Sequence, residues 1–130
     1  YKTEELEGLS VTRFCEAVCA EGVGCSPGCN NALHTHALFK IADVYGTGKP
    51  TRIAYTDTDI REFDKDLGPA EAIGASIYSI PWFKKYDKEA IEKYAEAFRK
   101  AALNYKELLP GDKGNPAQLG GWHFFSHSAK

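Results

Sequence analysis

The stretch that decides the fold is residues 87–109, which read DKEAIEKYAEAFRKAALNYKELL. Apolar side chains recur along it at helical spacing, and Asp87 at its start is a residue type that caps helices. The apolar stripe consists of Ile91, Tyr94, Ala95, Phe98, Ala102 and Tyr105. Pro110 and Gly111 then stop the pattern. The stretch therefore predicts one long amphipathic helix that packs on a core through this stripe.

A second helix is predicted near the N-terminus of the chain. Ser10 is a good N-cap, apolar residues recur at helical spacing after it, and Gly22 is a typical C-terminal stop. Residues 23–25 are then expected to form a short strand, broken by the Ser-Pro-Gly sequence that follows. Another short strand is expected at residues 52–55.

The middle of the chain has a weaker pattern. Residues 29–50 show little periodicity, which is typical of a binding loop or lid. A short helix is expected at residues 69–76, with Ala70 and Ile73 facing the core. A strand is expected at residues 77–80.

The order of these elements predicts an α+β fold with a small, mainly antiparallel sheet and helices packed on one face. We expect residues 1–109 to form one domain and residues 110–130 to form a Gly/Pro-rich and aromatic C-terminal tail. A sheet of two or three strands is close to the lower limit of stability. This limit favours a structure that is completed by neighbouring polypeptide.

Composition excludes several classes of function. The chain has 130 residues, a net charge of −2, 43% hydrophobic and 26% charged residues, which is typical of one globular domain. There is no basic block for nucleic acid and no apolar run that could span a membrane. The first residues lack a secretory signal, so we expect a cytoplasmic protein. Because the chain contains no methionine and ends in Lys130, we interpret it as a fragment of a longer protein.

The cysteines raise the possibility of a metal site. Cys15, Cys19, Cys25 and Cys29 are separated by three, five and three residues, unlike the two-residue spacing of zinc ribbons. Further ligand types are present at His34, His36, His123 and His127. We expect the cysteines to be reduced packing residues and no metal to bind. The alternative is a small self-contained module that binds zinc through Cys and His, or that binds another protein through its aromatic tail.

Three stretches resemble the C-terminal small domain of the DegT/StrS-type aminotransferases, which are fold type I enzymes that depend on pyridoxal phosphate. Residues 13–23 (RFCEAVCAEGV) are similar to the helix of the family that leads into "AEGI". Residues 31–39 (NALHTHALF) are similar to its "PLHxxPLF" loop, with Ala37 in place of the second proline. Residues 70–83 (AEAIGASIYSIPWF) are similar to its "AE…LSLP" step from helix to strand. Together the resemblance extends over residues 8–109.

The resemblance implies that the parent protein is a transaminase acting on a keto-sugar, either free or nucleotide-linked. The lysine that forms the Schiff base with pyridoxal phosphate lies in the N-terminal large domain of such enzymes, outside this chain. The chain is therefore expected to contain no catalytic residue, to bind no cofactor alone and to be inactive alone. Its partners are expected to be that large domain, a second subunit of a homodimer, the keto-sugar and an amino-acid donor.

The resemblance also implies where substrate is contacted. It places the loop that contains residues 31–39 at the substrate cleft, which the small domain closes. We expect His34 and His36 to contact substrate, with Asn30 and Asn31 as polar helpers. Histidine suits this role because each ring nitrogen can donate or accept a hydrogen bond, and because its charge can pair with a phosphate.

Overall fold

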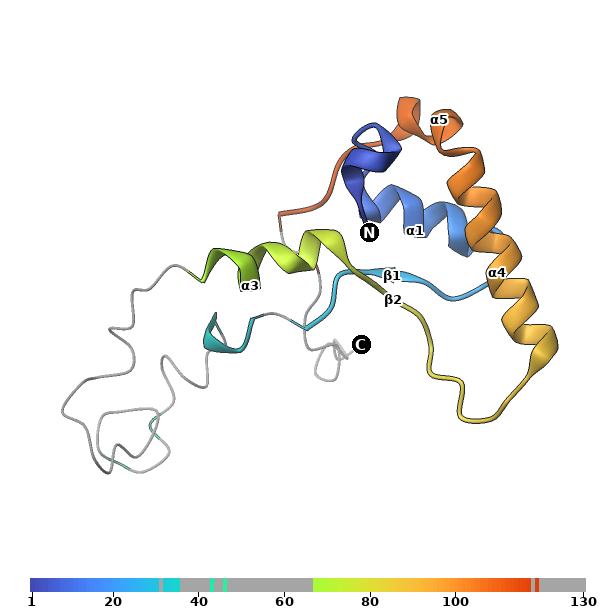
Figure 1. The fold of residues 1–130 in the computed structure, drawn as a ribbon. Coiled ribbons are helices and arrows are strands. Elements are labelled where there is room, and N and C mark those ends of the chain that lie inside the picture. Colours follow the sequence, from blue (N-terminus) through green and yellow to red (C-terminus); the bar gives the residue numbers. More distant parts are fainter. Residues whose placement is uncertain (31, 36–42, 44–45, 47–66, 118, 120–130) are drawn as a thin grey trace, which may run out of the picture.

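The computed structural model describes residues 1–30, 32–35, 43, 46, 67–117 and 119. These residues combine helices with one small antiparallel sheet of two strands, so the predicted α+β class is confirmed (Figure 1). In chain order the elements are η1 Thr3–Leu6, α1 Val11–Ala20, β1 Ser26–Pro27, η2 Leu33–Thr35, α3 Gly68–Ala72, η4 Ile73–Ser76, β2 Tyr78–Ser79, α4 Lys88–Leu103, α5 Tyr105–Leu108 and η5 Leu109–Gly111. The η elements are 3-10 helices.

Helix α1 begins and ends as predicted. The hydroxyl of Ser10 accepts a hydrogen bond from the backbone amide of Arg13 at 3.1 Å, which caps the first turn. After the helix, Gly22 has a φ of +83°, and its amide donates to the carbonyl of Cys19 at 2.9 Å. The apolar face of the helix forms most of the core. The buried residues on it and just before it are Leu9, Val11, Phe14, Cys15 and Val18.

Helix α4 begins at its predicted cap and ends earlier than predicted. The carboxylate of Asp87 accepts a hydrogen bond from the amide of Ala90 at 3.0 Å. The helix is interrupted at Asn104, whose side-chain amide donates to the carbonyl of Lys100 at 2.8 Å. The short helix α5 continues the chain after this interruption. The predicted single helix is therefore two helices.

The face of α4 that meets the core differs in part from the predicted stripe. Its buried residues are Ala97 and Ala101, and these small side chains let α4 pack against α1. Half-buried members of the predicted stripe are Tyr94, Phe98 and Tyr105. The prediction was wrong for Ile91, Ala95 and Ala102, which are exposed. Spacing alone selected the wrong alanines because alanine is common on both faces of a helix.

Four aromatic rings join the helices to the sheet. The ring of Phe14 on α1 lies 6.0 Å from the ring of Phe98 on α4. Tyr78 on β2 stacks on Phe98 at 5.1 Å and lies 6.1 Å from Phe14. Tyr1 contacts Phe14 at 5.2 Å. Because both phenylalanines contact Tyr78, α1 and α4 lie on the same side of the strands as that ring.

The two strands form a short antiparallel ribbon. Ser26 is paired with Ser79, and Pro27 is paired with Tyr78. The amide of Gly28 donates to the Ile77 carbonyl at 2.8 Å and extends the pairing by one residue. The strand predicted at residues 77–80 is therefore confirmed at its centre.

The strand predicted at residues 23–25 was wrong, since β1 begins at Ser26, within the Ser-Pro-Gly sequence that was expected to break the strand. Gly24 does not pair with another strand; its amide donates to the hydroxyl of Tyr94 at 3.0 Å. Val23 is buried in the core instead of alternating along a sheet. Proline is tolerated in β1 because this strand is at an edge.

The helix predicted at residues 69–76 exists as the α-helix α3 followed by the 3-10 helix η4. The prediction that Ala70 and Ile73 face the core was wrong, because both are exposed. Figure 1 shows the reason: α3 extends away from the body formed by α1 and α4.

Some predictions fall outside the described residues. These include the strand at residues 52–55 and the aromatic part of the tail at residues 122–125. The beginning of the tail is described, and Asp112 lies against the start of α1, where it accepts a hydrogen bond from Ser10. Within the described ranges, no helix has the length and apolar content that a membrane crossing requires.

If the aromatic cluster holds the fold together, Phe14→Ala should destabilise the chain by about 3–5 kcal/mol, because it removes a buried ring and leaves a cavity. The matched control is Trp82→Ala, since Trp82 is 93% exposed and its loss should change stability by less than about 0.5 kcal/mol. Urea unfolding followed by circular dichroism measures both. Equal effects of the two substitutions would contradict this account of the core.

Candidate functional site

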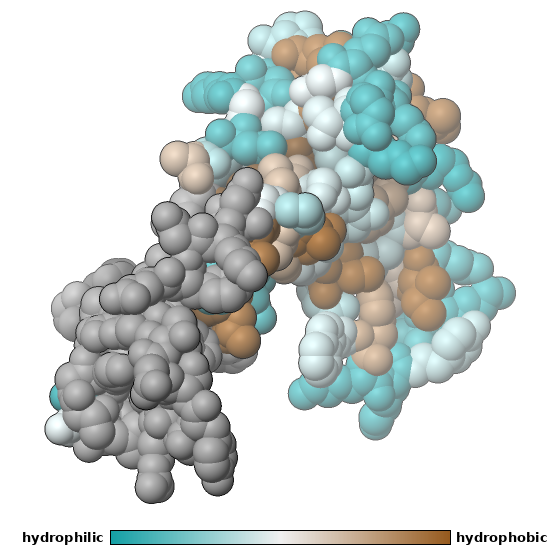
Figure 2. Space-filling view, turned by 60° about the vertical axis from the view of Figure 1, so that its left-hand side comes forward, coloured by the Kyte–Doolittle hydropathy of each residue, from teal (hydrophilic) through white to brown (hydrophobic). Residues whose placement is uncertain are grey.

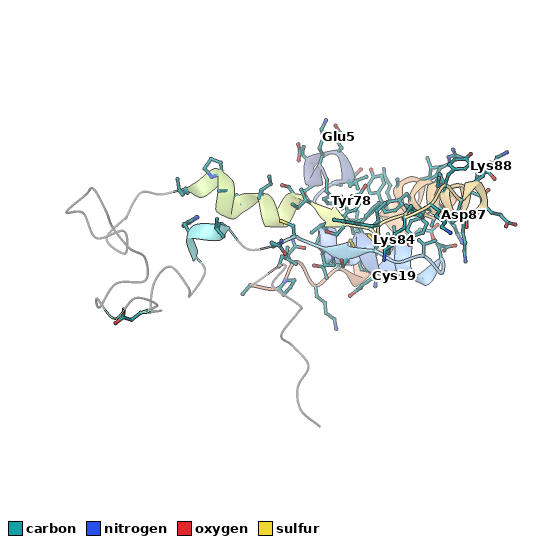
Figure 3. All side chains as sticks on the ribbon, turned by 90° about the horizontal axis from the view of Figure 1, so that it is seen from below. Glu5, Cys19, Tyr78, Lys84, Asp87 and Lys88 are labelled. Carbon is teal, nitrogen blue, oxygen red and sulfur yellow. The ribbon has the colours of Figure 1, made fainter. Side chains whose placement is uncertain are left out.

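The structure places two of the four predicted substrate residues. Asn30 is exposed at a bend that follows β1, and His34 is half-buried in η2. Asn31 and His36 lie outside the described residues. Figures 1 and 3 show η2 next to α3, beyond the end of the ribbon. The described candidate site is therefore the segment that extends from the ribbon, with Asn30 and His34 on it.

The ribbon fixes the direction in which this segment leaves the body. The Ser79 hydroxyl donates to the carbonyl of Gly28 at 3.1 Å, just before the chain turns toward Asn30. The thiol of Cys29 donates to the carbonyl of Asn30 at 3.2 Å. These contacts connect the predicted substrate residues to β2, which is itself held by the aromatic cluster.

Gly24, just after the first resembling stretch, passes close to Pro81 of the third. A Cβ atom at this position would lie 3.0 Å from Cγ of Pro81 and 3.3 Å from the hydroxyl of Tyr94. Real Cβ atoms rarely approach other atoms so closely, so a side chain at Gly24 would push Pro81 away. Residue 24 follows the first resembling stretch, and Pro81 belongs to the third.

Large apolar side chains are exposed around the ribbon and α4. Figure 2 shows apolar surface on the described body, between its polar ends. The exposed large apolar residues are Leu33, Ile73, Tyr78, Ile80, Trp82, Phe83, Tyr86, Ile91 and Leu103. Many of these residues lie in the segment 78–86, which precedes α4. Lys84 and Lys85 are in the same segment. Apolar exposure on this scale is typical of a surface that another protein surface covers.

A hollow of about 430 Å³ lies beside the first turn of α1. Its lining residues are Thr12, Arg13, Glu16 and residues 111–116. The guanidinium of Arg13 pairs with Glu16 at 3.1 Å, while its Nε atom is buried without a hydrogen-bond partner. A Cβ atom at Gly111 would lie 2.9 Å from this guanidinium, so the chain passes Arg13 at close range.

Residues 112–115, which line one side of the hollow, bond to the start of α1. Asp112 accepts hydrogen bonds from the amide of Ser10 at 2.7 Å and from its hydroxyl at 2.6 Å. The side-chain oxygen of Asn115 accepts from the amide of Thr12 at 3.2 Å. Burial acts to raise the pKa of the Asp112 carboxyl, but the hydrogen bonds from Ser10 hold it below its ordinary value. The start of α1 is thus a docking point for residues 112–115, which sequence spacing could not reveal.

The cysteines form a cluster beside β1. Cys15 is buried and Cys25 is half-buried, and their sulfur atoms are 3.3 Å apart. Cys19, labelled in Figure 3, is exposed, and its thiol donates to the carbonyl of Cys25 at 3.0 Å. Burial raises the pKa of both Cys15 and Cys25. A raised pKa favours the neutral thiol at neutral pH.

The described part of the chain contains no zinc site of the kind that the alternative requires. Among those residues, no group of three or more His, Cys, Asp or Glu side chains is arranged to hold a metal ion. His36, His123 and His127 lie outside the described residues.

The described lysines do not fit the covalent attachment of pyridoxal phosphate. All of them are exposed: Lys2, Lys84, Lys85, Lys88, Lys93, Lys100, Lys106 and Lys113. A hydrogen bond with Glu5 raises the pKa of Lys2, and one with Glu7 raises that of Lys106. A lysine that attacks a carbonyl needs the opposite change, which a desolvated site supplies.

Comparison with known proteins gives no relative. No family model, no curated protein and no solved structure matches this chain. Function is therefore inferred from the residues and their geometry.

The docking of Asp112 predicts a pH-dependent contribution to stability. At neutral pH, Asp112→Asn should destabilise the chain by about 1–2 kcal/mol, because an amide nitrogen cannot accept the hydrogen bond from Ser10. The pKa of Asp112 is lowered in the folded state from an ordinary value of 3.8. The stabilisation is therefore complete well above that value and is lost as pH falls through the folded pKa.

Urea unfolding at neutral pH and at about pH 3 measures this dependence. The difference between wild type and Asp112→Asn should shrink at the lower pH. Glu96→Gln, on the exposed face of α4, is the control and should have little effect at either pH. A difference that stays constant with pH would show that the charge of Asp112 does not hold the tail.

Proposed function

We propose that this chain is the C-terminal small domain of a transaminase of the DegT/StrS type, which depends on pyridoxal phosphate and acts on a keto-sugar. In this proposal the parent protein is a cytoplasmic homodimer. Pyridoxal phosphate and the lysine that binds it belong to an N-terminal large domain. The present chain, as the small domain, closes the cleft and contacts the keto-sugar, and an amino acid supplies the amino group.

The observation that carries the proposal is how stretches far apart in the sequence meet. Residues 13–23 and 70–83 carry two of the three resemblances, and the β1–β2 ribbon brings their ends together. At the junction, Gly24 leaves just enough room for Pro81. The ends of two resembling stretches therefore lie side by side, as they would in one small domain, and this supports the proposal.

The placement of Asn30 and His34 supports a role in substrate binding. Both residues lie on the segment that leaves the ribbon, outside the core built by α1 and α4. An imidazole and a carboxamide each offer a hydrogen-bond donor and an acceptor, which suits the hydroxyl groups of a sugar. In an apolar core, the same two groups would lack hydrogen-bond partners.

The exposed apolar side chains support the proposal that another protein surface covers this chain in the whole protein. Trp82 and Tyr86 precede α4, and both rings are largely exposed. Interfaces are enriched in aromatic side chains, because these bury a large apolar area. We infer that the large domain or the second subunit covers this region in the whole protein. The same residues would also serve the alternative, a module that binds an unrelated protein.

The cofactor tests the proposal directly. The protein encoded by the complete reading frame should bind pyridoxal phosphate and show the visible absorbance of the lysine-bound cofactor. The present chain, purified in the same way, is the control and should remain colourless. A complete protein that neither absorbs visible light nor binds added pyridoxal phosphate would exclude the transaminase.

The predicted histidines test the substrate role separately. In the complete protein, His34→Ala and His36→Ala should each raise the KM for the keto-sugar about tenfold, which corresponds to the loss of one hydrogen bond. The absorbance of the cofactor should not change. Lys88→Ala is the control, because this lysine pairs with Glu92 on the surface of α4. An unchanged KM in both histidine variants would remove these residues from the site.

A further inference from the structure

Two thiols meet where the chain turns back along α1. Cys15 lies in the middle of that helix and Cys25 directly precedes β1, with their Sγ atoms 3.3 Å apart. Gly22, with a φ of +83°, reverses the chain between them. A disulfide joins its sulfur atoms at about 2.05 Å, so these atoms must approach by about 1.3 Å.

The reversal is held by contacts that involve no sulfur atom. The amide of Gly22 donates to the carbonyl of Cys19 at 2.9 Å, and the amide of Gly24 donates to the hydroxyl of Tyr94 at 3.0 Å. Ser26 is fixed in the ribbon by its pairing with β2. The backbone therefore keeps the two thiols in contact before any bond forms between them.

We propose that Cys15 and Cys25 are a redox modification site, which a small-molecule disulfide oxidises to an intramolecular disulfide. This site is independent of the proposed transaminase function.

The oxidation proceeds by two thiol–disulfide exchanges. Cys25 is the first nucleophile because it is half-buried, whereas Cys15 is only 1% exposed. The Cys25 thiol loses its proton and its sulfur attacks the oxidant, whose S–S bond breaks and releases one thiolate. Cys15 then loses its proton and attacks the Cys25 sulfur, which releases the second thiolate. The two cysteines lose two electrons and two protons, and the oxidant becomes two thiols.

The environment of the sulfur atoms agrees with this order. Burial raises the pKa of both thiols, so the first step should be slow at neutral pH and faster in mild alkali. The contact with Cys15 opposes part of the increase at Cys25, because a neighbouring thiol can donate a hydrogen bond to the Cys25 thiolate.

The remaining cysteines provide matched controls. Cys19 is exposed, and its thiol donates to the carbonyl of Cys25. Cys29 donates to the carbonyl of Asn30, beyond β1. Both can form mixed disulfides with an oxidant, so the test must separate them from the proposed pair.

The experiment treats the reduced chain with oxidised glutathione, in the Cys29→Ser background. Unreacted thiols are then alkylated in acid, and the chain is cleaved after glutamate. Cleavage places Cys15 in residues 8–16, Cys19 in residues 17–21 and Cys25 in residues 22–62. We expect the main product to join residues 8–16 to residues 22–62, with a loss of about 2 Da for the two thiol hydrogens.

Two cysteine variants and the melting temperature of the oxidised chain complete the test. Cys19→Ser should keep the cross-link, whereas Cys25→Ser should abolish it. The oxidised chain should melt about 5–10 °C higher than the reduced chain, and added dithiothreitol should reverse the change. A main product that joins residues 17–21 to residues 22–62, adducts with glutathione alone, or a melting temperature that does not rise would each overturn the proposal.

Discussion

The contact between Phe14 and Phe98 is the interaction on which the rest of the structure depends. These rings bring α1 and α4 together, and Tyr78 of β2 packs on both. A two-stranded ribbon is at best marginally stable in water, so β1 and β2 owe their order to this packing. Asn30 follows the ribbon directly, and its position therefore depends on rings that are remote in the sequence.

Local chemistry was predictable from the sequence, and long-range contacts were not. Ser10 and Asp87 cap their helices as predicted, because a cap is decided by residues three positions apart. The strand at residues 23–25 was misplaced because Gly24 bonds to the side chain of Tyr94, 70 residues away. Likewise, Asp112 docks on Ser10 across 102 residues, and no local pattern signals such a pair.

The candidate site shows the same division. Composition and motif singled out His34 and Asn30, yet neither could place them relative to the core. The thiol pair left a partial signal: Cys15 lies on a capped helix, and the glycine stop at Gly22 turns the chain back along it. What the sequence lacked was the distance between the two sulfur atoms, which depends on how Gly24 and β1 are held.

The thiol pair and the ribbon act on the same few residues, and this limits what oxidation can do. Cys25 stands directly before β1, whose position is already fixed by strand pairing and by the hydrogen bond from Gly24 to Tyr94. A disulfide at Cys25 would add a third restraint in the same place. Oxidation would therefore make the reversal between α1 and β1 more rigid without redirecting the segment that carries Asn30. A stabilising cross-link is for this reason a better account of the pair than a switch between two conformations.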